Sequence, residues 1–369
     1  MDKNRLHVID GVRGWAAFSV LLFHVFCETF SMLKPEFRSV FTHFIFNGPL
    51  AIAVFFVLSG DALSTGYLKN QKLRTIDSLL LKRYFRLTIP IFMSCLIVYL
   101  LMEAGLMFNV EAAPIVHREG WLGSFIPFQP SIITLFRYSF YQVYDSFSNS
   151  ASFSPLSISY NPFLWTMSIE FIGSMLVFLF LYVSNRLVSP IKLLIPIIVF
   201  LFLEKSYYAL FFVGVLFANY RISGVFTKLL INKAWQIATI IIILALIIID
   251  TQLRFFISQG HVNIVISSAL VFCIYSSNWC VSVFSCRISR ILGKLSFPLY
   301  LIHFSVIASL TSFLIIKYSD TLDSYHIYLI SFISILASVL GATLFYFVED
   351  YLLFHVNKIP RLLLKSNYE

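Results

Sequence analysis

Long apolar runs, separated by short polar segments, dominate this chain. About ten runs approach the length of about 20 mainly apolar residues that a helix needs to cross a membrane. The pattern therefore predicts an all-α integral membrane protein with about ten transmembrane helices, in a single domain over residues 1–369. The runs cover residues 11–30, 47–67, 87–108, 163–184, 190–204, 206–220, 235–250, 263–282, 297–317 and 325–349.

Composition excludes a water-soluble domain. Of the 369 residues, 59% are hydrophobic and 12% are charged, whereas soluble domains have about 45–50% apolar and about 25% charged residues. The five cysteines are an odd number, show no Cys-x-x-Cys spacing and lie mostly in apolar runs. They predict neither a disulfide framework nor a zinc site, and we expect no metal.

The net charge of +9 is explained by membrane topology. If the N-terminus is cytoplasmic, 20 of the 27 Lys and Arg residues fall in the predicted inner segments, as the positive-inside rule requires. An even number of spans places the C-terminus in the cytoplasm as well. The basic excess is thus a topology signal, and we expect no nucleic-acid partner.

One long connection, about residues 109–162, is predicted on the outer side. Its end, residues 145–155, is rich in Ser with interleaved Phe. Two interpretations remain open, a flexible loop or a partly re-entrant flap over an outward-facing cavity, because Phe is unusual in a purely solvated linker.

Ionisable residues at membrane depth are costly unless they are paired or hydrated, so they indicate function. With a rise of 1.5 Å per residue, His24 and Glu170 lie at about the same depth, some 20 Å from the inner edge. We predict that they meet, with Glu170 orienting His24 as a general base. Arg13 precedes His24 by eleven residues and shares its helix face, so the two suit an elongated anionic ligand. The alternative is that Arg13 only reaches the headgroups.

Other polar residues at the same membrane face extend this prediction. Arg83 and Arg86 are spaced to hold one anion between them, and Lys82 adjoins them; topology anchoring is the alternative. Asp61 and His303 both lie about 9 Å from the inner edge; the alternative to a role in the site is that they only neutralise each other. Glu349 is predicted to be interfacial.

Five segments, taken together, resemble the acyltransferase-3 family of membrane-bound O-acyltransferases. Ile9-Asp-Gly-Val-Arg13 followed by His24 resembles the Arg-x10-His signature. Residues 55–60, Phe-Phe-Val-Leu-Ser-Gly, resemble the second-helix motif. Residues 82–90 resemble the basic motif before the third helix. Leu164-Trp165-Thr-Met-Ser168-x-Glu170 and the segment from Leu292 to His303 are similar to two later motifs. Asp61 and Phe297 depart from the family pattern, where aromatic residues are usual.

The resemblance implies a reaction and its participants. Acyl-CoA, usually acetyl-CoA, is the expected donor, with no permanently bound cofactor. The acceptor is a hydroxyl of a cell-surface carbohydrate such as O-antigen, lipopolysaccharide or exopolysaccharide, and the location is the bacterial inner membrane. Arg83, Arg86 and either Lys82 or Arg13 would bind the donor phosphates. His24 would act as the base or as a covalent acyl carrier, and Asp61, Trp165, Ser168 and His303 form a second tier.

Other functions remain open at this point. A relative of the same family could modify peptidoglycan, a periplasmic glucan, a lipooligosaccharide or a small molecule. A transporter or flippase of a lipid-linked sugar would share the buried charges, but it usually shows repeat symmetry and broken helices in corresponding halves, which this sequence lacks. Oligomeric state stays undetermined.

Overall fold

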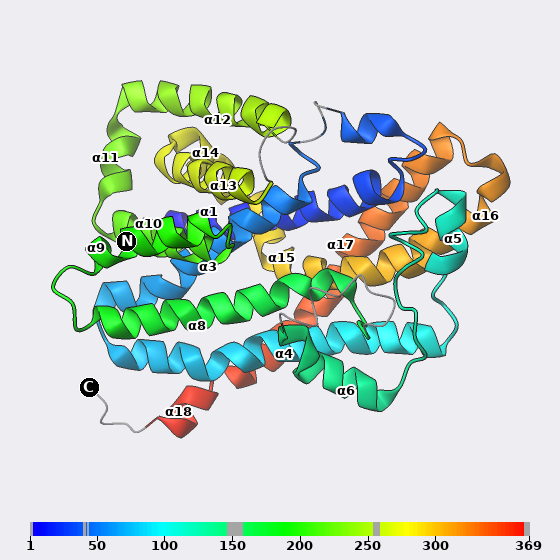
Figure 1. Cartoon of the computed structure of the whole chain (residues 1–369), viewed down its shortest axis with the longest axis horizontal. Helices are drawn as coiled ribbons and strands as arrows, with labels where there is room; N and C mark the ends of the chain where they lie inside the picture. Colours follow the sequence, from blue (N-terminus) through cyan, green and yellow to red (C-terminus); the bar gives the residue numbers. More distant parts are fainter. Residues whose placement is uncertain (1–2, 40–41, 43, 146–157, 254–258, 365–369) are drawn as a thin grey trace.

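The computed structural model describes residues 3–39, 42, 44–145, 158–253 and 259–364, and this part of the chain is helical and contains no β-strand. Figure 1 shows the helices as a bundle whose long members run roughly side by side. In chain order the elements are α1 (Lys3–Leu22), η1 (Phe23–Thr29), η2 (Pro35–Arg38), α3 (Gly48–Asn70), α4 (Leu73–Glu103), α5 (Asn109–Ile115), α6 (Ile132–Phe140), η3 (Gln142–Tyr144), η4 (Pro162–Trp165), α8 (Thr166–Ser184), α9 (Pro190–Leu203), α10 (Tyr208–Ile222), α11 (Val225–Ile231), α12 (Lys233–Leu253), α13 (Gln259–Ser276), α14 (Asn278–Ser285), α15 (Arg287–Val306), η5 (Ile307–Thr311), α16 (Ser312–Lys317), η6 (Ser319–Thr321), α17 (Ser324–Val356) and α18 (Ile359–Leu363).

The chain is an all-α, multi-pass membrane protein. Within the described residues, seven helices are long and apolar enough to cross a membrane, and nine if each of two bent helix pairs counts as one span. The bends are 67° between α10 and α11 and 90° between α13 and α14. Each of the ten predicted runs falls on a helix or helix pair, the short α9 included. The number of crossings and the placement of the termini stay predictions.

The two ends of the bundle can be told apart by the elements that lie there. We call the end where α1 begins and α3 meets α4 the basic end, and the end where η1 and α16 lie the far end; they are left and right in Figure 1. Helix α18 also lies at the basic end. The helices that carry the predicted site residues run between these ends.

Close helix contacts at glycines hold the centre of the bundle together. A Cβ atom added to Gly60 on α3 would lie 1.9 Å from the carbonyl oxygen of Phe211 on α10. A Cβ on Gly14 of α1 would lie 2.4 Å from the backbone of Gly293 on α15. Both glycines are therefore required, because any side chain would force the paired helices apart.

The α3–α10 contact also buries an ion pair. Asp61 pairs with Arg221 and accepts a hydrogen bond of 2.8 Å from the Tyr275 hydroxyl, and Thr65 donates to the same carboxylate at 2.9 Å. The alternative left open by the sequence, that Asp61 and His303 neutralise each other, is therefore excluded. Depth arithmetic placed them at one level, but Asp61 faces α10 and α13 rather than α15.

The predicted outer connection is folded where the structure describes it. After α5, its second half returns along α4: the Tyr84 hydroxyl donates to the carbonyl oxygen of Phe140 at 2.8 Å, and Thr88 is 2.8 Å from the Tyr144 hydroxyl. Tyr84 lies 19 residues before the end of α4, about 28 Å along the helix. This segment thus runs back along more than half of α4, while the flap predicted at 145–155 lies, from residue 146 on, outside the described residues.

Candidate active site

A cavity of about 260 Å³ opens among α1, α3, α4, α8, α15 and α17, and we call it the basic cavity. It combines four cations with three acids, so its formal charge is 4 − 3 = +1. The Nε atoms of Arg13 and Arg83 are buried and have no hydrogen-bond partner in the described structure. Unpaired guanidinium donors of this kind suit an anionic ligand. The charged residues in the lining are Arg13, Arg83, Arg86, Lys294, Glu170, Glu349 and Asp350.

Glu170 organises the basic cavity. Its carboxylate forms an ion pair with Arg83 and accepts a 2.7 Å hydrogen bond from the Ser59 hydroxyl. The predicted contact between Glu170 and His24 is therefore wrong, although both residues lie deep in the bundle. Equal depth left the direction of each side chain open, and α8 turns Glu170 toward α3 and α4. Glu170 thus fixes one guanidinium of the basic cavity and does not contact the imidazole.

Sequence reasoning did not assign three charged residues of the lining to a site, namely Lys294, Glu349 and Asp350. Lys294 lies in the Leu-Gly-x-x-Ser stretch of α15 and was counted only for topology, although its charge within a motif was a usable signal. Glu349, whose interfacial depth stays a prediction, is 7% exposed and lines the cavity. Lys82, predicted beside Arg83 and Arg86, does not line the cavity.

A second cavity of about 340 Å³ contains His24, and we call it the aromatic cavity. His24 belongs to η1, a π-helical turn; such turns occur frequently at functional sites. The Phe163 ring stacks on the His24 ring with 3.9 Å between centroids and 9° between planes. The other aromatic residues of the lining are Phe23, Trp121, Trp165, Tyr207 and Tyr300.

His24 is paired with His303. His24 Nδ1 lies 3.0 Å from His303 Nε2, and His303 Nδ1 lies 2.9 Å from the carbonyl oxygen of Leu299, one turn earlier on α15. His303 is 1% exposed. Phe163 packs on this ring as well, with centroids 4.9 Å apart. The two imidazoles, not an imidazole and a carboxylate, therefore form the central polar contact.

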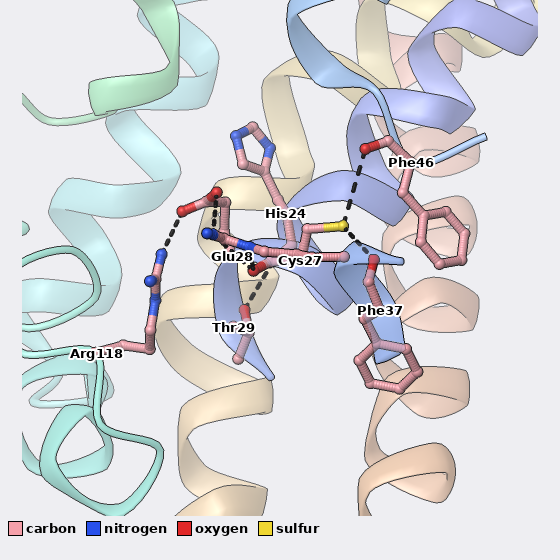
Figure 2. Close-up of polar contacts among 8 residues, drawn as sticks. His24, Cys27, Glu28, Thr29, Phe37, Phe46 and Arg118 are labelled. Carbon is pink, nitrogen blue, oxygen red and sulfur yellow. Dashed lines mark hydrogen bonds and ion pairs between the residues drawn. The ribbon is translucent and has the colours of Figure 1, made fainter. Parts of the chain in front are cut away.

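A carboxylate lies near His24 but faces other partners. Glu28 forms ion pairs with Arg38, at 2.9 Å, and with Arg118. Figure 2 shows the Glu28 carboxylate turned toward Arg118, with the His24 ring directed away from this contact. Partial burial lowers the pKa of Arg118, and the neighbouring Glu28 opposes that shift. Two arginines on one carboxylate leave an excess positive charge at this edge of the aromatic cavity.

Tyr300 and Ile52 line both cavities, so the two cavities adjoin. The Tyr300 hydroxyl donates to the carbonyl oxygen of Phe163 and lies 2.8 Å from Thr166 Oγ1. It thus ties α15 to the start of α8 at the boundary between the cavities. The shared wall gives an elongated ligand anchored in the basic cavity a short route toward His24 past these two side chains.

The remaining predicted residues have separate places. Trp165 lines the aromatic cavity. Ser168 is 2% exposed and its hydroxyl donates to the carbonyl oxygen of Trp165 at 3.1 Å, so it stabilises the start of α8 and lines neither cavity. Within the described residues, no cluster of three or more His, Cys, Asp or Glu side chains could hold a metal ion.

Comparison with known proteins agrees with the helical architecture and the motifs. Residues 6–347 match a family model described as an acyltransferase domain. No curated protein and no solved structure gave a match. The matched range includes every charged residue of the two cavities except Glu349 and Asp350.

Proposed function

Because the chain belongs to the acyltransferase-3 family, we propose that it transfers an acyl group, with acetyl as the first candidate, from acyl-CoA to a hydroxyl of a cell-surface carbohydrate. The observation that carries the proposal is the junction of the two cavities. One cavity presents unpaired cationic donors, the other presents an imidazole among aromatic rings, and they share a wall.

The donor occupies the basic cavity in this proposal. The phosphates of acyl-CoA are anions, and Arg13, Arg86 and Lys294 supply charge at the lining, with Arg83 held in place by Glu170. Arg13 and His24 are eleven residues apart, about 16 Å along the helix. An elongated donor is therefore needed to bring a thioester from the cations to the imidazole.

The acceptor occupies the aromatic cavity. Sugar rings have apolar faces that stack on aromatic side chains, and Trp121 and Trp165 offer such surfaces. Asn263 in the same lining can donate and accept hydrogen bonds. In this proposal the acceptor hydroxyl lies beside His24.

The reaction that follows is a single acyl transfer. His24 takes the proton of the acceptor hydroxyl while its oxygen forms a bond to the thioester carbonyl carbon. The carbon–sulfur bond then breaks, and the leaving thiolate takes the proton from the protonated His24. The products are the O-acyl sugar and CoA, and His24 returns to its starting state.

The test uses purified protein in lipid with radiolabelled acetyl-CoA and surface polysaccharide from the source cells. We expect label in the polysaccharide as alkali-labile acetate, and a loss of about 10²–10⁴-fold in kcat for His24→Gln with donor binding retained. Transfer by the variant at the original rate would refute the role of His24. Passage of a lipid-linked sugar across the bilayer without acyl transfer would instead favour a transporter.

A covalent acyl-histidine intermediate is the second version of this chemistry. It is distinguished by rapid denaturation of the protein at neutral pH and low temperature after incubation with donor alone, because an N-acyl imidazole hydrolyses in acid. Label retained on the wild-type protein and absent from His24→Gln would support the covalent route, and no label on either would support direct transfer. Cells of a deletion strain, compared with the parent, would show which polysaccharide loses acetate and test the expected inner-membrane location.

A further inference from the structure

Resting on the proposed function, we infer that His303 is a positioning residue that fixes which nitrogen of His24 is the base. The inference comes from the contacts of the two imidazoles alone. His303 Nδ1 lies 2.9 Å from the Leu299 carbonyl oxygen, and a carbonyl oxygen can only accept a hydrogen bond. His303 Nδ1 must therefore carry the hydrogen.

The second nitrogen of His303 then has a defined role. A neutral imidazole carries one N–H, so His303 Nε2 is an acceptor. It lies 3.0 Å from His24 Nδ1, which consequently donates to it. His303 is neutral because the ring is 1% exposed and forms no described contact with a carboxylate; an unpaired buried charge would be costly.

The hydrogen bond to His303 determines which nitrogen of His24 carries the hydrogen. With its hydrogen on Nδ1, its free electron pair is on Nε2, and the ring lines the aromatic cavity. The centroids of the two imidazoles are 5.1 Å apart and their planes differ by 22°, as expected for rings bonded edge to edge. Phe163 stacks on His24 and packs on His303, which keeps the two rings in register.

The arrangement also supports the ring after it takes a proton. Protonated on Nε2, His24 still donates from Nδ1 to His303, so the bond to His303 becomes charge-assisted and stronger. Nothing in the chain from Leu299 to His24 has to rearrange. His303 thus serves as the orienting group that a carboxylate supplies in many general-base sites.

Two substitutions separate this role from a purely structural one. In His303→Gln, the amide can donate to Leu299 and accept from His24 Nδ1, as the imidazole does, but it cannot exchange protons. In His303→Leu, both contacts are lost. His355 is a matched control, because its Nδ1 also lies near the carbonyl oxygen four residues earlier, at 3.1 Å, while the ring is exposed.

We expect His303→Leu to lower kcat by at least about 100-fold, His303→Gln to remain within about tenfold of the wild type, and His355→Leu to match it. Donor Kd should stay within twofold in all three, which also shows that the variants are folded. Equal losses in the Leu and Gln variants, or no loss in either, would overturn the assignment.

A spectroscopic measurement tests the same point without the acyl transfer. Solid-state ¹⁵N spectra of protein labelled at histidine report which ring nitrogen carries hydrogen, and the signals missing in His24→Gln identify His24. We expect hydrogen on Nδ1 of His24 in the wild type and a changed tautomer in His303→Leu. Hydrogen on Nε2 of wild-type His24 would contradict the inference even if the proposed reaction is correct. Conversely, if the wild-type protein showed no acyl transfer, the proposed function would fail, but the tautomer found in the spectra would still stand.

Discussion

Replacing the cations of the basic cavity one at a time should weaken donor binding in a graded way. Arg13 is partly buried and its Nε has no partner. A hydrogen bond to a charged group contributes about 1.5–3 kcal/mol, which is about a 10- to 150-fold rise in the Kd of CoA for Arg13→Gln. Arg86 is exposed at the rim, where an ion pair contributes about 0.2–1 kcal/mol, so Arg86→Gln should raise Kd less than about fivefold.

Lys82→Gln is the matched control, because it removes a cation from the same helix turn outside the cavity. The assay is titration of lipid-embedded protein with CoA and with dephospho-CoA, each at low and high salt. Dephospho-CoA lacks the 3′-phosphate of CoA. Substituting a residue that contacts this phosphate should therefore reduce the difference between the Kd values of the two ligands. High salt should reduce the rise in Kd caused by Arg86→Gln more than the rise caused by Arg13→Gln, because exposed charges are screened more strongly. If Lys82→Gln raised the Kd of CoA as much as Arg13→Gln does, the reasoning would be refuted.

Three further substitutions test the assignments made above. Glu170→Gln should lower kcat less than tenfold in steady-state assays, since Glu170 contacts Arg83 rather than the base; a loss as large as that of a His24 variant would contradict this. Asp61→Leu should destabilise the protein by about 3–5 kcal/mol in thermal unfolding, because Arg221 is left buried and unpaired; the double variant with Arg221→Met should recover much of that loss, and no recovery would argue against the pair. Gly60→Ala should reduce the yield of folded protein on size exclusion, whereas Gly120→Ala, which has nothing within 4 Å of its added Cβ, should not; equal yields would show that the α3–α10 contact tolerates a side chain.

The helices were predictable because membrane-spanning segments carry their signal in local composition. Each apolar run became a helix, since the backbone of a membrane segment must satisfy its own hydrogen bonds. The positions of Arg13, Arg83 and Arg86 around one cavity also followed from depth and helix face. These quantities depend only on the position along one helix.

Pairing between helices was less predictable, because depth is only one of the coordinates that a contact requires. Glu170 and Asp61 were assigned partners at equal depth, and both face other helices in the structure. The pairing of His24 with His303 requires the rotation of α1 against α15, which close packing at Gly14 and Gly293 sets. Such packing depends on residues far apart in the sequence, and one sequence does not reveal it.

The π turn at Phe23–Thr29 holds one more residue than an α-helical turn of the same rise. Deleting Val25 would let the helix close to regular geometry and rotate every later position by about 100°. The imidazole before the deletion would keep its place, while Glu28 would turn away from its two arginines. The extra residue therefore works as an offset in the helix, which lets one continuous segment aim an imidazole and a carboxylate in different directions.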